Sequence, residues 1–323
     1  MNNKIKLNLF SLKTQKDLEE VYLFFKKNTQ KWFDQKSKPK EEFFEIKPCP
    51  LCFKDKSEQV YLIDGFSYHR CTHCHSIYTK PQLRNGVLDE LYSEGMYKVY
   101  QDNFLKKGKE IRKGTLEQRK FNQVSSFVNK NNPKILDIGC GAATFLDVCK
   151  LNGWNVEGVD PSPSASKSAQ ENYQIHVHQG DFNKIVFNKF FDVITLWGVL
   201  EHLSDPIKAI NKARDLLSED GLLIFEVPSA DCFLSEYLRK YNFPATRYIE
   251  SGRHNIFFSR RVINEIADEF DFEIEFIESN GLDIQTILFK EFDDKTTESI
   301  INIQDTLNDL LLGDHYRVFL KKK

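Results

Sequence analysis

The sequence lacks an excess of charge of either sign. Its 323 residues include 45 Lys and Arg against 47 Asp and Glu, so the formal net charge at pH 7 is −2. A protein that binds nucleic acid needs a basic surface, and this composition supplies no general argument for one. We therefore do not expect a nucleic acid as the partner.

The sequence also lacks a long apolar run near its first residue. Residues 1–6, MNNKIK, predict neither a signal peptide nor a membrane span. The seven cysteines cannot all pair as disulfides, and four of them form two C-x-x-C motifs. These features favour reduced thiols, a metal site and a cytoplasmic location with no membrane association.

The two C-x-x-C motifs have the spacing of a zinc ribbon. Eighteen residues separate the first pair, Cys49 and Cys52, from the second pair, Cys71 and Cys74. Between the pairs, residues 60–70 contain two runs of β-forming residues around an Asp-Gly dipeptide, which predicts a hairpin. Each motif aims two thiolates at one point, and four thiolates leave no open position. The predicted Zn²⁺ is therefore structural.

The segments on either side of the ribbon are expected to be mainly helical. Residues 1–47 contain an amphipathic pattern over 16–32, which predicts a helix that packs on the main body or on a second subunit of a homodimer. The zinc ribbon itself is assigned to residues 48–82. Residues 83–133 predict a helical lid or linker, which includes three tyrosines that could cover a ligand: Tyr92, Tyr97 and Tyr100.

Residues 134–323 alternate between strand and helix patterns. This alternation is typical of an α/β fold with a doubly wound, mostly parallel sheet. The predicted strands are 134–137, 155–160, 175–178, 191–197, 222–227, 272–277 and 315–320. A loop-rich insertion covers 228–258, and the pattern over 281–295 is ambiguous.

A glycine turn follows the first of these strands. Gly139 and Gly141 allow a tight turn and let a ligand approach the main chain. A dinucleotide fingerprint would require a third glycine at position 144, where the sequence has Thr. Asp137 would also repel a pyrophosphate placed against the turn. The turn therefore points away from a dinucleotide.

Two more acids stand at the ends of the next two strands. Asp160, twenty-one residues after Gly139, is placed to accept hydrogen bonds from a ribose diol. Asp181, after the third strand, could accept one from an exocyclic amine. Acids at three successive strand ends suit a ligand with hydroxyls, an amine and a positive centre.

These motifs resemble those of the class I methyltransferases that use S-adenosyl-L-methionine (SAM), over about residues 134–320. The matching segments are 136–141 (LDIGCG), 159–160 (VD), 180–182 (GDF), 191–194 (FDVI) and 219–222 (EDGL). The resemblance implies a Rossmann-like, seven-stranded sheet with its last strand antiparallel, and SAM as the cofactor. It also implies donor-binding residues: Asp137, Gly139 and Gly141 for the methionine part, Asp160 for the ribose, Asp181 and Phe182 for the adenine, and Trp197 near the methyl donor.

Catalytic residues are expected after the fourth strand, where the crevice of an open α/β sheet lies. His202 is the leading base, because an imidazole titrates near neutrality. Glu201 beside it could serve instead or help to hold a metal. His254, in the insertion, is the third candidate, since members of this family often place substrate contacts there. A base is needed only if the acceptor loses a proton during the reaction.

A zinc ribbon ahead of this fold resembles methyltransferases of deoxysugar, surface-polysaccharide and natural-product pathways. The resemblance implies methyl transfer to a small-molecule acceptor, with a saccharide or a nucleotide-linked sugar as the leading acceptor. Two alternatives stay open. One is an RNA base methyltransferase that uses the ribbon for recognition, and the other is a SAM-binding protein that transfers nothing.

Overall fold

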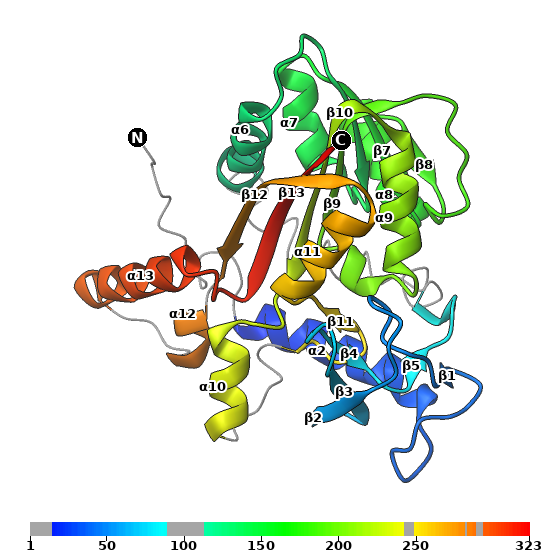
Figure 1. Cartoon of the computed structure of the whole chain (residues 1–323), viewed down its shortest axis with the longest axis vertical. Coiled ribbons are helices and arrows are strands. Elements are labelled where there is room, and N and C mark those ends of the chain that lie inside the picture. The colour runs from blue at the N-terminus through cyan, green and yellow to red at the C-terminus, as the bar shows by residue number, and fades with distance from the viewer. Residues whose placement is uncertain (1–14, 89–112, 242–248, 282, 289–292) are drawn as a thin grey trace.

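The computed structural model describes residues 15–88, 113–241, 249–281, 283–288 and 293–323. A twisted sheet flanked by helices forms the upper part of the molecule in Figure 1, and a smaller unit built around short strands lies below it. None of the described helices combines the length and the apolar composition that crossing a membrane requires. The tyrosines of the predicted lid, Tyr92, Tyr97 and Tyr100, lie outside the described residues.

The upper part is organised around a seven-stranded sheet in the order β12-β13-β10-β9-β6-β7-β8. β13 runs antiparallel to β10 and β12, and the pairs from β10 to β8 are parallel. The strand bounds are β6 Lys134–Ile138, β7 Asn155–Asp160, β8 Val177–Gln179, β9 Phe191–Trp197, β10 Leu217–Pro228, β12 Phe272–Asn280 and β13 His315–Lys322. The predicted α/β, Rossmann-like sheet with an antiparallel last strand is confirmed, although the third strand begins two residues later than predicted.

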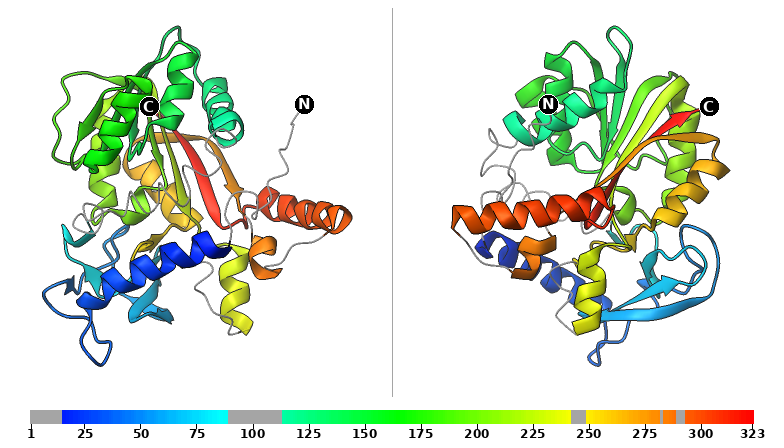
Figure 2. Two further views of the ribbon diagram at one scale, coloured as in Figure 1. Left: turned by 180° about the vertical axis from the view of Figure 1, so that it is seen from behind. Right: turned by 60° about the vertical axis from the view of Figure 1, so that its left-hand side comes forward.

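Helices cover both faces of this sheet, because its inner strands are apolar on both faces (Figure 2). Ile135 of β6 packs with residues of α6, α7 and α8, whereas Leu136 packs with residues of α9 and α11. The helix bounds are α6 Gln118–Ser126, α7 Thr144–Leu151, α8 Pro163–Tyr173, α9 Pro206–Leu216 and α11 Arg260–Glu269. Side-chain caps begin three of these helices: Ser162, Asp205 and Ser259.

The lower unit contains a four-stranded sheet in the order β11-β4-β3-β2. β2 (Ser57–Ile63) and β3 (Phe66–Cys71) pair antiparallel around Asp64 and Gly65, so the predicted hairpin is confirmed. β4 (Ile77–Thr79) pairs with β11 (Ile256–Phe257), which comes from the insertion after the fifth strand of the main sheet. The insertion is therefore not only loop, because it supplies an edge strand that joins the two units.

The N-terminal helical segment lies against this lower sheet. α2 (Gln15–Thr29) continues into η1 (Gln30–Trp32), and the aromatic ring of Trp32 is buried against Phe66 and Phe43. β1 (Phe44–Glu45) pairs with β5 (Gln82–Leu83) beside them. The predicted helix thus packs within the same chain, but on the lower sheet and the insertion and not on the main sheet.

The remaining elements include the ambiguous stretch over 281–295 and the described end of the predicted lid. Part of the ambiguous stretch over 281–295 folds as α12 (Asp283–Leu288), and α13 (Asp294–Asp309) begins within it. The described end of the predicted helical lid forms a π-helix, η4 (Lys113–Glu117), that leads directly into α6. α10 (Phe233–Tyr241) lies in the insertion, and η5 (Leu200–His202) follows β9.

Candidate functional site

The glycine turn after β6 has the backbone that only small residues adopt easily. Gly139 and Gly141 have φ values of +71° and +52°. A Cβ atom at Gly139 would collide with the side chain of Val199, which follows β9. The Gly139 N–H donates to the carbonyl of Val159 at 2.7 Å, so the turn is fastened to the end of β7. Glycine is therefore required here by conformation and by space.

Asp160, the last residue of β7, links the glycine turn to the segment that follows β7. One carboxylate oxygen accepts from the Gly141 N–H and the other from the Ser162 N–H, each at 2.9 Å. Burial raises the pKa of Asp160, and these two backbone hydrogen bonds oppose that shift. A carboxylate can accept about four hydrogen bonds, so each oxygen retains a lone pair for a hydroxyl. This geometry fits the ribose diol of SAM.

Asp137 lies at the carboxyl end of β6 and is only 3% exposed. The Thr195 hydroxyl donates to it at 2.6 Å, and burial raises its pKa to about 7 despite this bond. An acid in this position is close to half ionised at neutral pH. A nearby cation would complete its ionisation, and the sulfonium and ammonium of SAM are groups of that kind.

The predicted adenine residues occupy a loop after β8. Asp181 accepts from the Asn183 N–H at 2.9 Å and lies 3.3 Å from the Lys184 ammonium, so its carboxylate is partly engaged within its own loop. Phe182 is buried beneath the Lys212 ammonium, which lies 4.7 Å from the centre of its ring. The Asn183 side-chain oxygen is buried and accepts no hydrogen bond. Adenine binding by Asp181 and Phe182 stays a prediction.

Trp197 ends β9 at the same edge of the sheet. Its ring packs edge-on against Phe145 with centroids 5.3 Å apart, and two cations contact it: the Lys120 ammonium at 4.8 Å and the Arg317 guanidinium at 5.3 Å. The indole N–H is buried and has no hydrogen-bond partner. Trp197 is therefore placed beside the glycine turn with an unused donor.

The three predicted catalytic side chains converge, although they come from separate segments. His202 belongs to η5, and its Nδ1 lies 2.7 Å from the Arg253 carbonyl of the insertion. The His202 Nε2 lies 3.6 Å from a Glu201 carboxylate oxygen. The His202 and His254 rings have centroids 5.2 Å apart. The sheet and the insertion thus build one cluster of two imidazoles and a carboxyl group.

Burial determines the charge of this cluster. It lowers the pKa of His202 to about 4, with a further contribution from the Arg253 cation, and it lowers the pKa of His254 well below its usual value. Burial also raises the pKa of Glu201 to about 7. Both imidazoles are therefore neutral at pH 7. Because Nδ1 of His202 donates to a carbonyl, the neutral ring carries its proton on Nδ1, and Nε2 is the unprotonated nitrogen.

The same three side chains could hold a small cation. One ligand atom from each of Glu201, His202 and His254 lies within 4.8 Å of the other two. However, the Oε2 atom of Glu201 and the Nδ1 atom of His254 are buried from solvent. A catalytic metal needs an open coordination position, and this burial disfavours one. Proton transfer needs no open coordination position, so the cluster suits this role better than it suits a catalytic metal.

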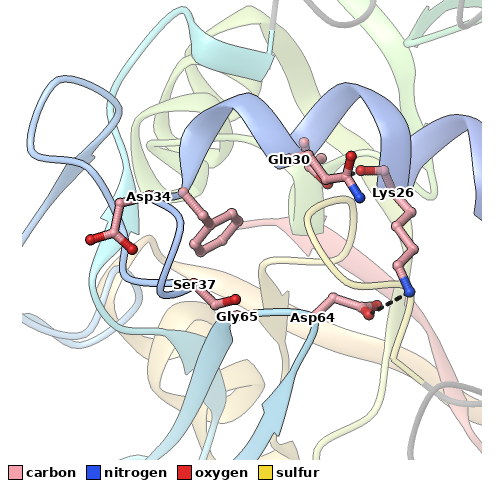
Figure 3. A pocket seen from close by; sticks show the side chains of 8 residues that line it. Lys26, Gln30, Asp34, Ser37, Asp64 and Gly65 are labelled. Carbon is pink, nitrogen blue, oxygen red and sulfur yellow. Dashed lines mark hydrogen bonds and ion pairs between the residues drawn. The ribbon is translucent and has the colours of Figure 1, made fainter.

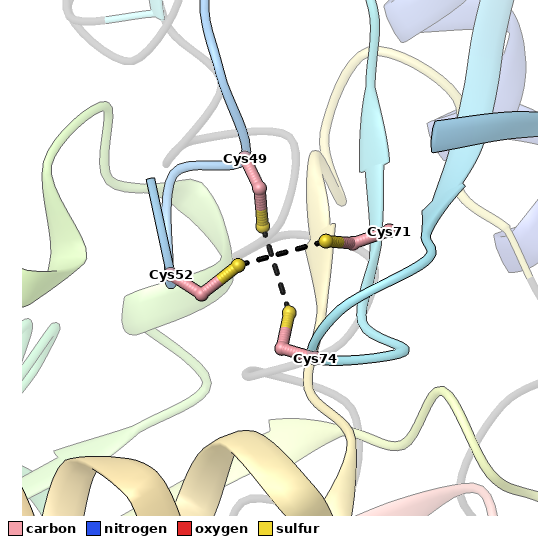
Figure 4. A group of neighbouring side chains, drawn as sticks. All are labelled: Cys49, Cys52, Cys71 and Cys74. Carbon is pink, nitrogen blue, oxygen red and sulfur yellow. Dashed lines mark hydrogen bonds between the residues drawn. The ribbon is translucent and has the colours of Figure 1, made fainter. Parts of the chain in front are cut away.

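The four cysteines of the C-x-x-C motifs lie together below the main sheet, with their sulfur atoms directed at one point (Figure 4). The sulfurs of Cys49 and Cys74 are 3.7 Å apart, and those of Cys52 and Cys71 are 3.5 Å apart. A tetrahedral zinc site with Zn–S bonds of about 2.3 Å has sulfur–sulfur edges of roughly 3.8 Å. A hydrogen bond between the sulfurs of Cys49 and Cys74 lowers the pKa of Cys74 to about 5 and raises the pKa of Cys49. The donor set and its spacing fit Zn²⁺.

A separate hollow of about 410 Å³ lies between α2 and the turn of the β2–β3 hairpin (Figure 3). It contains none of the predicted site residues. Asp64 on its wall is engaged, because it accepts from the hydroxyls of Tyr22 at 3.1 Å and Ser251 at 2.7 Å and lies 3.7 Å from the Lys26 ammonium. These contacts hold α2, the hairpin and the insertion together, so Asp64 on the wall of the hollow has a structural role.

Some charged residues near the site were not predicted from the sequence. His315 of β13 contacts Asp314 at 2.7 Å; burial alone would lower its pKa, but this carboxylate raises it to about 9. Arg317, two residues on, pairs with Glu226 at 2.6 Å. Both lie on a strand whose pattern predicts only a sheet element. Their roles depend on the neighbours that the antiparallel last strand brings to them.

Substituting Asp160 by Asn is expected to weaken the binding of S-adenosylhomocysteine, the demethylated product, by roughly 10- to 100-fold. One carboxylate oxygen becomes an NH₂ group, which cannot accept from Gly141 or Ser162 and leaves a buried donor unpaired at a cost of about 1–3 kcal/mol. Isothermal titration calorimetry measures the change. Asp192→Asn is the control, because Asp192 lies near the amino end of β9, whereas Asp160 lies at the carboxyl end of β7. Equal losses of affinity in both variants would contradict the assignment of Asp160 to the ribose.

Similar proteins were found among protein families, curated proteins and solved structures. A family model described as a methyltransferase domain matches residues 109–276, just over half of the chain. A ubiquinone biosynthesis O-methyltransferase from Actinobacillus pleuropneumoniae is 36% identical over 103 residues, which cover 28% of this chain and 44% of that protein. The enzyme of the same description from Haemophilus ducreyi is 32% identical over 120 residues, covering 33% and 51%.

The chain therefore spans about half the length of the curated relatives that it matches. Among solved structures, a SAM-dependent methyltransferase from Thermotoga maritima superposes with a TM-score of 0.46 at 17% identity. That superposition covers 66% of this chain and 92% of the other.

Proposed function

The chain belongs to the family of methyltransferase domains, and we propose that this SAM-dependent methyltransferase transfers a methyl group to a hydroxyl oxygen of a small-molecule acceptor. The leading acceptor is a saccharide, a nucleotide-linked sugar or a related natural product. The names of the partially matching relatives support oxygen as the acceptor atom. The orientation of His202 is the structural observation that carries the proposal.

His202 is oriented to take a proton. Its Nδ1–H donates to the Arg253 carbonyl, which fixes the ring and leaves Nε2 as the acceptor. Burial lowers the pKa of His202 to about 4, so the ring is neutral over the whole physiological range; the same shift makes it a weaker base than the imidazole titrating near neutrality that the sequence predicts. η5 begins three residues after Trp197 ends β9, so His202 belongs to the connection that leaves the carboxyl end of β9, the strand that pairs with β6.

Bound SAM supplies an electrophilic methyl group on a positively charged sulfur. The Asp160 carboxylate and the glycine turn would hold the donor, and fixed alignment of this kind can supply roughly 7–11 kcal/mol in a bimolecular transfer. His202 Nε2 receives the proton that leaves the acceptor hydroxyl as its oxygen is methylated. The ionised Glu201 carboxylate, 3.6 Å from Nε2, stabilises the imidazolium that results.

The character of the acceptor follows from the neutral state of the two imidazoles. His202 and His254 are uncharged, and the nearby Arg253 is paired with Glu250. Uncharged imidazoles suit hydroxyl groups, which both donate and accept hydrogen bonds, better than they suit a phosphodiester backbone. These observations favour a polyhydroxyl small molecule over RNA as the acceptor.

We also propose that the four-cysteine cluster holds one structural Zn²⁺. The cluster lies in the apolar core that contains Tyr78 of β4 and Ile256 of β11. Through this contact the metal would hold the lower sheet, and with it the Arg253 carbonyl that orients His202. Four protein thiolates leave no position for substrate, so the metal takes no part in methyl transfer.

The rate of transfer is expected to depend on pH through Glu201 and not through His202. Burial raises the pKa of Glu201 to about 7, so the carboxylate that stabilises the imidazolium is lost as the pH falls below 7. At saturating SAM, whose positive charges keep Asp137 ionised, the value of kcat/KM for the acceptor should therefore fall about tenfold per pH unit below 7 and level off above it. Glu201→Gln should lower the plateau and abolish this dependence. A Glu201→Gln profile that keeps the same inflection would contradict the assignment.

The proposed function is tested by incubating the chain with methyl-labelled SAM and a panel of acceptors. The panel contains nucleotide-linked sugars, glycosides, phenols and an RNA transcript. Label in an O-methyl group of a small molecule supports the proposal. Label that enters only RNA, or only nitrogen or carbon, overturns it, as does donor binding without transfer to any acceptor.

A further inference from the structure

The π-helix η4 and the first turn of α6 place two opposite charges beside the glycine turn. π-helical turns are rare and occur frequently at functional sites. Glu117 ends η4, and Lys120 follows three residues later in α6. η4 packs against α7, the helix that begins immediately after the glycine turn. The wide turn thus brings these side chains to the edge of the sheet where the donor residues lie.

The two charges form an ion pair, but neither side chain makes a hydrogen bond to a residue in the described part of the chain. The Oε2 atom of Glu117 is buried and accepts no hydrogen bond. The Lys120 ammonium lies 3.5 Å from that atom, and the two side chains are only 16% and 19% exposed. Buried charges without hydrogen bonds are costly unless another group satisfies them. A pair left in this state next to a ligand site suggests that the ligand completes it.

The position of the pair corresponds to one end of the donor. Glu117 raises the pKa of Asp137 and Lys120 lowers it, so both charges act on the acid at the end of β6. The Lys120 ammonium also lies over the ring of Trp197, at the end of the neighbouring strand β9. Asp137 is the residue expected at the methionine part of SAM. Asp160, expected at the ribose, lies one strand away on β7.

Arg317 is the other cation on the Trp197 ring, and it is already fully engaged. Its guanidinium donates to Glu226 at 2.6 Å and 3.0 Å, to Glu278 at 3.1 Å and to Gln123 at 2.6 Å. These contacts leave it little capacity to bind a carboxylate. Lys120, in contrast, donates no hydrogen bond to any residue in the described part of the chain. Its ammonium can therefore bind a carboxylate.

The methionine end of SAM carries one ammonium and one carboxylate at neutral pH. A carboxylate and an ammonium held side by side match that zwitterion with the charges exchanged. We infer that Lys120 binds the carboxylate of the donor and that Glu117 binds its ammonium. The pair would thereby distinguish SAM and its product from adenosyl compounds that lack the amino acid. This inference rests on the proposed function.

Calorimetry with three ligands tests the two roles separately. The ligands are S-adenosylhomocysteine, decarboxylated SAM and 5′-methylthioadenosine, which lacks the whole amino acid. Lys120→Met should weaken S-adenosylhomocysteine by roughly 10- to 100-fold and leave decarboxylated SAM unchanged, because a charged hydrogen bond is worth about 1.5–3 kcal/mol. Glu117→Gln should weaken both of these ligands. Neither variant should change the affinity for 5′-methylthioadenosine.

The matched control is the ion pair Lys167–Glu171 of α8, whose side chains are 74% and 63% exposed. Lys167→Met and Glu171→Gln should change no affinity. Equal losses for all three ligands in Lys120→Met or Glu117→Gln would overturn the inference, because they would indicate a purely structural role. Unchanged affinity for S-adenosylhomocysteine in both variants would also overturn it. If the unmodified chain binds no adenosyl compound, the proposed function itself fails.

Discussion

Replacing His202 by Asn is expected to lower kcat by roughly 10²- to 10⁴-fold, the range that a positioned base contributes. The Asn amide can still donate to the Arg253 carbonyl in the place of Nδ1–H, so the local fold should persist. It has no group that can take the proton held by Nε2. The binding of S-adenosylhomocysteine should stay unchanged, because the donor residues are not altered. Steady-state kinetics and calorimetry measure the two quantities.

His176 provides the control for this experiment. It is an exposed residue beside the edge strand β8, and His176→Asn should leave kcat unchanged. A His202→Asn variant with kcat within about threefold of the unmodified chain would mean that alignment alone drives transfer. A variant that also loses donor binding would mean that His202 supports the donor site, which would contradict a role in proton transfer.

The second large effect that we expect is the loss of zinc, and of the structure that it supports, when a cysteine of the cluster is replaced. Purified protein should contain one zinc per chain, and Cys71→Ser should abolish it, because a structural zinc site contributes about 10–16 kcal/mol of binding energy at neutral pH. The hairpin of β2 and β3 and the edge strand β11 should then lose protection from hydrogen exchange. Methyl transfer should fall with them, because β11 belongs to the segment that orients His202.

Donor binding should survive the loss of zinc, because the glycine turn and Asp160 lie in the main sheet. Cys232→Ser is the matched control. It changes another buried cysteine, outside the cluster, that accepts from the Ser235 N–H, and a serine hydroxyl can keep this bond. Elemental analysis that finds no metal in the unmodified chain, or full exchange protection of the hairpin in Cys71→Ser, would contradict a structural zinc.

The main sheet could be predicted from local patterns. Apolar runs such as the one that forms β6 fit only a strand covered on both faces, and the glycine turn after it has a conformational requirement that the sequence displays. The acids at the ends of successive strands could be located for the same reason. The order of the strands could not be derived from periodicity, because pairing partners depend on connections and not on local composition.

Residues whose role depends on distant neighbours were harder to predict. β11 has only two residues, and its pairing with β4 joins segments almost 180 positions apart in the chain. The Arg253 carbonyl orients His202, but no sequence pattern marks a backbone acceptor. Glu117 and Lys120 appear in the sequence as ordinary helix charges. Only the packing of η4 and α6 against α7 brings Lys120 over the ring of Trp197, with Glu117 beside it.

The most direct test of the account is a crystal structure of the chain with S-adenosylhomocysteine and a trapped acceptor. The account predicts ribose hydroxyls on Asp160 and the ligand sulfur facing His202. The acceptor oxygen should lie within 2.6–3.2 Å of Nε2 and, once the methyl group is placed on the sulfur, about 3–3.5 Å from the methyl carbon. A sulfur that faces away from His202, or an acceptor oxygen beyond reach of Nε2, would contradict the account.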